Sequence, residues 1–190
     1  VPVWAERTVG HAIFHPEHIE ERYGLFTIIV LGESMISAVA GFRVELESSG
    51  LTTELLVIGL AALVLAFSAW WLYFDHPGHL TPNPEVAFRW GYAHVVVFAT
   101  LAATGAGIHV AAEAVGGHAS ARVAAMSVAV PAAGYLLGLA LVMTVTGFRL
   151  TDRRLSPKLA GAVVVLALGA VAPVTVAVAG AATVFLALAL

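Results

Sequence analysis

The sequence contains no cysteine and very little charge. Without cysteine, the chain can form neither a disulfide framework nor a thiolate metal site. Only 11% of its 190 residues are charged, whereas the share in soluble domains is about a quarter. The net charge of -3 is small and no run of basic residues is present, so we do not expect nucleic acid as a partner.

Hydrophobic residues make up 60% of the chain, and the mean hydropathy is +0.93. Soluble domains are roughly 45–50% apolar, so this composition predicts an integral membrane protein whose main partner is the lipid bilayer. The chain begins at Val1 and ends inside an apolar run at Leu190. We therefore expect a piece of a longer protein, with an N-terminal half of the same chain as a further partner.

Long apolar runs predict an all-α, polytopic bundle of transmembrane helices. A helix over the nineteen residues of the first run is roughly 28 Å long, which matches the thickness of the hydrocarbon core. We divide the chain into a polar, amphipathic segment, 1–23, and a membrane bundle, 24–190. The first four expected spans are Gly24–Phe42, Leu55–Phe74, Trp90 to about Ala112, and about Val123 to Phe148, the last with a kink at Pro131.

The last apolar run, Leu159–Leu190, is too long for one span without strong tilt. Pro173 lies near its middle and favours a hairpin of two short helices. The expected count is therefore six spans, or five if this run is a single kinked helix.

Basic residues test this layout, because Lys and Arg concentrate in cytoplasmic loops. If loop 149–158 and segments 1–23 and 75–89 share one membrane face, seven of the nine basic residues lie on that face. The other two are Arg43 and Arg122. The N-terminus is therefore expected on the cytoplasmic side of the membrane.

Glu33 is the most unusual residue of the first run, because it lies near the middle of a hydrophobic segment. An ionised carboxylate is costly in hydrocarbon unless it is protonated, paired or facing water. Ser37 lies one helical turn further along, on the same face. The alternative is a protonated carboxyl group that only joins two helices by a hydrogen bond.

The expected topology gathers other polar residues near Glu33. His18, Glu21 and Arg22 would share one helix face at the cytoplasmic mouth, where they could also be no more than a surface ion pair. Asp75 would lie at the same level, and His94 about 6 Å deeper. A carboxylate and a histidine that exchange protons are typical of proton relays, so these residues form a predicted proton or substrate path, although His94 could simply bond a carbonyl group.

Two H-x-x-H steps, His15/His18 and His76/His79, could bind a divalent metal ion. Proline interrupts both steps, and glycine also interrupts the second, so we assign no metal site and no cofactor. No serine lies in a nucleophile-elbow pattern, and no glycine-rich phosphate loop is present.

Three motifs together resemble the bacterial low-temperature requirement protein A family. They are H-I-E-E-R-Y-G-L-F-T-I-I-V-L-G-E-S at 18–34, W-W-L-Y-F-D at 70–75 and Y-A-H at 92–94. The resemblance covers the C-terminal half of that family and extends over residues 15–112. It implies a bacterial cytoplasmic membrane protein linked to growth in the cold. It also implies that the six polar residues named above, His18, Glu21, Arg22, Glu33, Asp75 and His94, are characteristic positions of the family.

Three functions fit these observations. The preferred one is a proton-linked transporter or permease-like protein for a small molecule or ion, because the ionisable groups form a graded path. The second is a membrane-embedded enzyme or a protein that binds a cofactor or metal. The third is a structural protein that adapts the membrane for growth in the cold.

Overall fold

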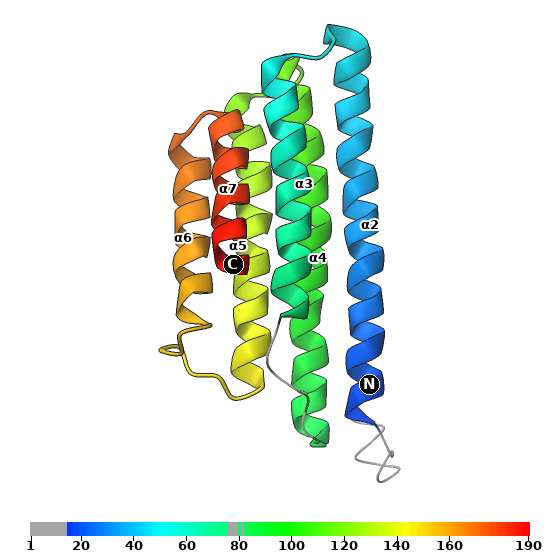
Figure 1. Cartoon of the computed structure of the whole chain (residues 1–190), viewed down its shortest axis with the longest axis vertical. Coiled ribbons are helices and arrows are strands. Elements are labelled where there is room, and N and C mark those ends of the chain that lie inside the picture. The colour runs from blue at the N-terminus through cyan, green and yellow to red at the C-terminus, as the bar shows by residue number, and fades with distance from the viewer. Residues whose placement is uncertain (1–14, 76–79, 81) are drawn as a thin grey trace.

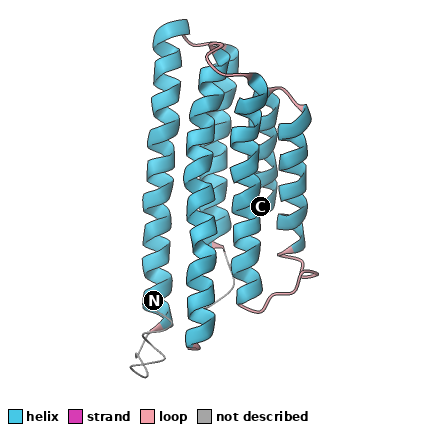
Figure 2. Ribbon diagram, turned by 180° about the vertical axis from the view of Figure 1, so that it is seen from behind, coloured by secondary structure: helices cyan, strands magenta, loops and turns pink. Residues whose placement is uncertain are grey.

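A computed structural model describes residues 15–75, 80 and 82–190, and within these ranges it contains six helices and no strands (Figures 1 and 2). The predicted all-α membrane bundle is therefore confirmed. The helices are α2 (Pro16–Ser49), α3 (Thr53–Phe74), α4 (Pro84–Val115), α5 (Ala121–Val145), α6 (Ser156–Val171) and α7 (Val174–Ala189).

Local sequence signals set most helix boundaries. Proline occupies a first position of α2 and α4, where its missing N–H costs nothing. Polar side chains cap three helix starts: Thr52 accepts from the N–H of Leu55, Asn83 from that of Glu85, and Ser120 from that of Val123. At the end of α2, Gly50 adopts a positive φ of 75°.

Four of the helices, α2 to α5, are long and apolar enough to cross a membrane. The remaining two, α6 and α7, are apolar but have only 16 residues each. They form the predicted hairpin over 159–190, because the chain leaves the helical conformation at Ala172 and Pro173. The interpretation of this run as one kinked helix is therefore wrong.

Helix α4 lies at the centre of the bundle and packs most extensively against α5 on one side and α2 on the other. Helix α7 fills the space between α3 and the α5–α6 pair, whereas α2 stands at the edge (Figure 1). Tyr135 of α5 joins these layers, because its buried hydroxyl donates a 2.7 Å hydrogen bond to the carbonyl of Ala69 on α3.

Helix α2 is much longer than the predicted first span. It begins in the expected surface segment and continues through 43–49, a stretch predicted to be a loop. Helix α4 likewise begins before Trp90. In both helices, backbone hydrogen bonding continues from the apolar run into the polar residues beside it. Hydropathy locates only the apolar run, so it does not show where such a helix begins or ends.

Pro131 lies inside a continuous α5. Proline has no N–H, so the carbonyl of Ser127 one turn earlier has no helical donor. This carbonyl lies directly against Gly107 of α4, at a place where a β-carbon could not fit. The carbonyl that the proline leaves without a helical donor therefore lies at a close backbone contact between α5 and α4.

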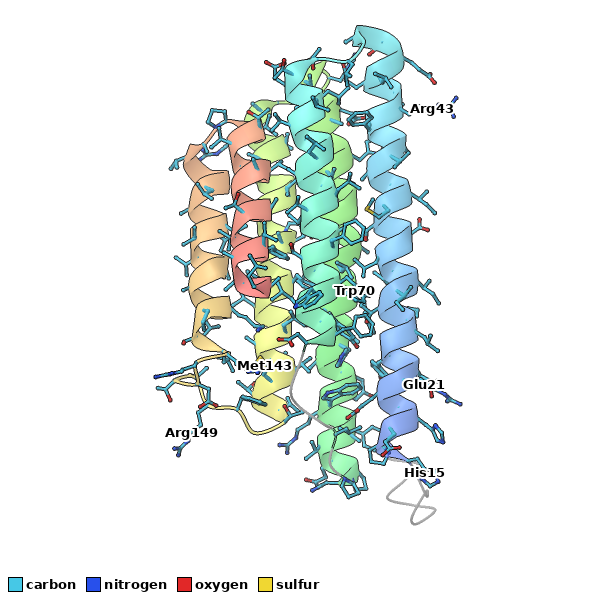
Figure 3. All side chains as sticks on the ribbon, viewed as in Figure 1. His15, Glu21, Arg43, Trp70, Met143 and Arg149 are labelled. Atoms are coloured by element: carbon cyan, nitrogen blue, oxygen red, sulfur yellow. The ribbon has the colours of Figure 1, made fainter. Side chains whose placement is uncertain are left out.

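The basic residues gather at one end of the bundle, as the expected topology requires. That end holds the start of α2, the end of α3, the start of α4 and the α5–α6 loop (Figure 1). His15, Glu21 and Arg149 lie there, whereas Arg43 lies at the other end (Figure 3). We call these the basic end and the far end. Residues 1–14, with Arg7, lie outside the described residues.

Candidate functional site

The contact between α2 and α4 is built on small and weakly polar residues. The buried positions of α2 recur every three or four residues: Gly24, Thr27, Leu31, Ser34, Ala38, Gly41 and Glu45. Ser34 donates a 3.0 Å hydrogen bond to the carbonyl of Leu101 on α4. Small residues let helix backbones approach closely in a membrane, and here they place polar groups of α2 against α4.

His94 is the most enclosed ionisable group near the basic end of this contact. Only 1% of it is exposed. Four aromatic rings surround it, and we call them the aromatic cage: Tyr23 of α2, Tyr73 of α3, and Trp90 and Phe98 of α4. The ring centroids of Trp90 and Tyr23 lie 3.9 and 4.9 Å from that of His94. Three helices therefore converge on one imidazole.

The hydrogen bonding of His94 fixes the chemistry of its ring. Its Nδ1 lies 2.8 Å from the carbonyl oxygen of Trp90, and because a carbonyl only accepts, Nδ1 carries the hydrogen. In the neutral ring, Nε2 is then the atom that takes up a proton. The resulting imidazolium would face aromatic rings, whose π-electrons attract cations. The cage can therefore hold His94 in either protonation state.

The cage also contains polar atoms of its own. The Tyr73 hydroxyl hydrogen-bonds the side chain of Thr27, whose own hydroxyl donates to the carbonyl of Tyr23 at 2.9 Å. The indole Nε1 of Trp90 is buried and has no hydrogen-bond partner among the described residues. A buried donor of this kind is costly unless something accepts from it. The Trp90 Nε1–H is therefore available to a bound ligand or water molecule.

The predicted residues at the mouth lie outside the cage. His18 and Glu21 form an ion pair with 3.8 Å between Nδ1 and Oε2, and both side chains are about three-quarters exposed, at 74% and 70%. Arg22 is exposed beside them. Asp75, also exposed, faces Arg154 at 3.8 Å rather than His94. These four residues thus lie on the solvated surface of the basic end and not in the buried site.

Glu33 does not join this site, which corrects the expectation that it faces the same interior as His94. Its side chain is exposed on the outer face of α2, and Gly32 beside it has open space around it. The next residue, Ser34, is the one that faces α4. A helix turns by 100° per residue, so only one of two neighbours can point inward. Whether Glu33 has a functional role stays a prediction.

Ser37 meets a second histidine further toward the far end. Nδ1 of His109 lies 3.1 Å from the Ser37 carbonyl oxygen, and its Nε2 lies 3.4 Å from the carboxylate of Glu113. Both neighbours are acceptors. A neutral imidazole has only one N–H, so the imidazolium form is the one that satisfies both contacts. The α2–α4 contact therefore carries a protonatable histidine in each half of the bundle.

The structure offers little for a metal centre. Among the residues described, no group of three or more His, Asp or Glu side chains is placed to share a metal ion. His15 and His18 lie edge to face, with 5.6 Å between ring centroids. His76 and His79 lie outside the described residues.

A family model described as bacterial low temperature requirement A protein (LtrA) matches residues 1–190. The chain belongs to the LtrA family. No curated protein and no solved structure matches it. Membership of the LtrA family and the apolar helices together show an integral membrane protein.

In this LtrA-family chain, sequence reasoning found His94 but missed the residues that enclose it. Tyr23 stands inside the first family-like motif, Tyr73 inside the second, and Trp90 one turn before His94. Their common signal is an aromatic residue within two positions of a charged residue near a membrane boundary. Aromatic residues near charged ones also form belts at membrane interfaces, so this signal alone does not indicate a cage.

Proposed function

We propose that this chain is a proton-linked transporter or permease-like protein of the bacterial cytoplasmic membrane, in which His94 is the proton-binding group. The observation that carries the proposal is the complete burial of His94 inside the aromatic cage. Ionisable residues are rare in membrane spans because of their desolvation cost, and where they occur they commonly bind or relay protons.

The rest of the α2–α4 contact supports this proposal. Ser34 lies between the two histidines and bridges the helices near mid-bundle. His109 then provides a second protonatable ring toward the far end. Proton relays in pumps and transporters are built from such separated groups, which exchange protons when the helices shift. The substrate would be a small molecule or ion that approaches the unpartnered Trp90 Nε1.

Proton flux tests the proposal without knowledge of the substrate. Purified protein would be reconstituted into vesicles that contain a pH-sensitive dye, and an imposed pH gradient would be followed in time. We expect flux above that of protein-free vesicles, and we expect His94→Gln to reduce it to the protein-free level. His15→Gln is the matched control, because His15 is exposed at the same end of the bundle. Equal flux in wild type and His94→Gln would contradict the proposal.

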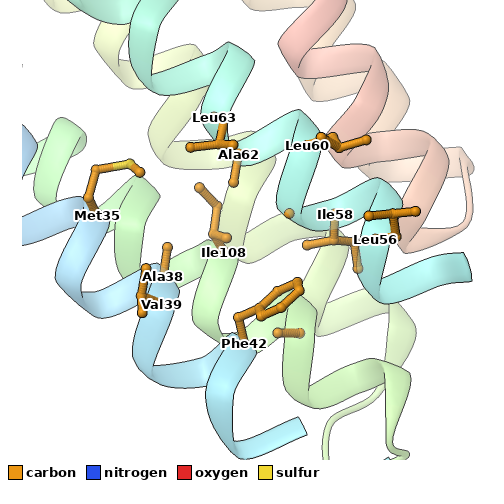
Figure 4. Close-up of a pocket in the computed structure, with 12 residues that line it drawn as sticks. Met35, Ala38, Val39, Phe42, Leu56, Ile58, Leu60, Ala62, Leu63 and Ile108 are labelled. Atoms are coloured by element: carbon orange, nitrogen blue, oxygen red, sulfur yellow. The ribbon is translucent and has the colours of Figure 1, made fainter. Parts of the chain in front are cut away.

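A second candidate function is adaptation to the surrounding lipid, as expected for a role in growth in the cold. A cavity of about 280 Å³ lies between α2 and α3, with Ile108 of α4 at its base (Figure 4). Its lining is apolar, and Val39, Leu56 and Leu63 on its rim are 59%, 44% and 43% exposed. The cavity therefore opens sideways, where acyl chains would lie, and its chemistry fits a lipid tail.

Filling this cavity distinguishes the two functions. Ala38→Phe would place a ring among the lining residues, whereas Ala40→Phe on the exposed side of α2 is the control. Under the lipid proposal, only Ala38→Phe lowers binding of spin-labelled phospholipid and impairs growth at low temperature, while proton flux is retained. Unchanged lipid binding in Ala38→Phe would remove this second candidate.

A further inference from the structure

Glu45 is a buried carboxylate that nothing in the proposed mechanism uses. It lies in the last two turns of α2, at the far end, and is 1% exposed. Within the part of the chain that the structure describes, neither of its carboxylate oxygens has a hydrogen-bond partner. An ionised carboxylate buried in this way carries the full cost of desolvation, so its charge must be compensated.

The backbone around Glu45 makes a negative charge still less favourable. The carboxylate lies against Gly116, directly after α4 ends, and a β-carbon at Gly116 would collide with both oxygens. The end of a helix carries partial negative charge from its unpaired carbonyl groups. Glu113, in the last turn of α4, adds a second carboxylate. The site therefore favours a cation.

Among the described residues, the two arginines of the far end make their contacts away from Glu45. Arg43 is bound to Glu47 at 2.7 Å on the exposed side of α2, and Arg122 of α5 donates to the carbonyl of Ala170. Glu54, at the start of α3, is exposed and adds another negative charge.

Two imidazoles of the described residues lie against these carboxylates. His109 faces Glu113, and Nδ1 of His118 lies 3.6 Å from Oε2 of Glu45. Two carboxylates thus meet two histidines, and this group is neutral when it has taken up two protons. The cation that the site favours is therefore a proton.

His118 also connects the buried carboxylate to water. It is 61% exposed, whereas Glu45 is buried, and it stands in the turn between α4 and α5. Gly117 precedes it with a positive φ of 80°, a conformation that suits glycine. The imidazole can therefore take a proton from solvent on one nitrogen while its other nitrogen faces the carboxylate.

We propose that Glu45 and His118 form a proton-binding site at the far end of the α2–α4 contact. The imidazole takes up a proton from water at Nε2, and the Nδ1–H bond then breaks as an O–H bond forms on Oε2 of Glu45. The result is a neutral carboxyl group and a neutral imidazole, so charge and atoms balance. Use of this site as the far-end opening of a transport path rests on the proposed function, but proton binding itself does not.

Infrared spectroscopy of the reconstituted protein tests the site directly, because a protonated carboxyl group has its own C=O stretching band. We expect a band at neutral pH that disappears in Glu45→Gln and persists in Glu47→Gln, the exposed control two residues away. In His118→Gln the alternative position for the proton is lost. The Glu45 band should then grow and persist to higher pH.

The outcomes separate this site from the proposed transport. If Glu45→Gln removes the band but wild-type vesicles show no proton flux, the site stands and the transport proposal fails. If flux is present but Glu45→Gln and Glu47→Gln have the same spectrum, the site is overturned. His118 is exposed, so its substitution should fold even if Glu45→Gln does not. An unchanged band in His118→Gln would also overturn the pairing.

Discussion

Ser34 of α2 lies directly against Gly105 of α4, so the two helix backbones touch near the middle of the bundle. A β-carbon at Gly105 would lie 2.5 Å from Cα of Ser34 and 2.7 Å from its Cβ. This approach places the Ser34 hydroxyl within 3.0 Å of the carbonyl of Leu101. The contact therefore sets the separation of the two helices that carry both protonatable histidines.

Gly105→Ala should destabilise the protein, because an added methyl group would force α2 and α4 apart. Overpacking of this kind typically costs about 1–3 kcal/mol in the free energy of unfolding. Gly32→Ala is the matched control, since a β-carbon there meets no atom within 4 Å. Unfolding in detergent micelles would measure both variants. Equal stability of the two would show that the backbones are not in contact at Gly105.

Trp90→Leu should reduce the fraction of His94 that is protonated at a given pH. The indole ring lies 3.9 Å from the imidazole, and an aromatic face stabilises a desolvated cation by about 0.5–2 kcal/mol. Nitrogen NMR of histidine-labelled protein would report the protonated fraction. Trp71→Leu, on the exposed surface of α3, should leave it unchanged. A larger effect from Trp71→Leu would contradict the role of the cage.

Glu33→Gln should leave the protonation of His94 unchanged, because Glu33 points away from the α2–α4 contact. The effects of Glu33→Gln and His94→Gln on the free energy of unfolding should then be additive, as they are for residues without shared partners. The same NMR measurement and a double-mutant cycle would check this. A change in the His94 signal would show that the two residues are coupled, as the sequence suggested.

Lys158 should make stability rise with pH in the alkaline range. Burial lowers its pKa from 10.5; Asp75 raises the value and Arg154 lowers it further. Between the lowered pKa and 10.5, the unfolded chain binds more protons than the folded chain, so the free energy of unfolding increases with pH in that window. Below the lowered pKa, the cost of burying the ammonium group is fully present.

Lys158→Met should therefore raise the free energy of unfolding at neutral pH and flatten its increase toward about pH 10. Arg153→Met, which removes an exposed charge just before α6, should keep the increase. Denaturation in micelles at several pH values would measure both. A wild-type free energy of unfolding that falls over this range would contradict the burial of Lys158.

The sequence predicted the arrangement of the helices well because hydrophobic length and proline are local signals. Pro173 indicated the turn between α6 and α7, and the basic residues indicated which ends lie together. The close packing of α5 on α4 also has a local signal, because Gly134 and Gly138, one turn apart, lie against Thr100 and Val97.

The inward face of α2 was harder to predict. Glu33 lies in a segment that is apolar on every side, so hydrophobic periodicity does not distinguish the lipid-facing from the protein-facing surface. The stripe of small residues through Ser34 and Gly41 does identify the protein-facing surface, since small residues mark helix contacts in membranes. The same spacing continues for one more turn to Glu45, which lies beyond the expected end of the first span at Phe42.

The shortness of α6 and α7 affects the lipid around the protein. Sixteen residues span roughly 24 Å, whereas the hydrocarbon core of a bilayer is about 30 Å thick. Along α2, 34 residues extend well beyond that thickness. Hydrophobic mismatch is therefore confined to one flank, where the bilayer must thin to meet the hairpin at a cost of a fraction of a kcal/mol per Å. A change in membrane thickness would thus affect the bundle only on the side of the α6–α7 hairpin.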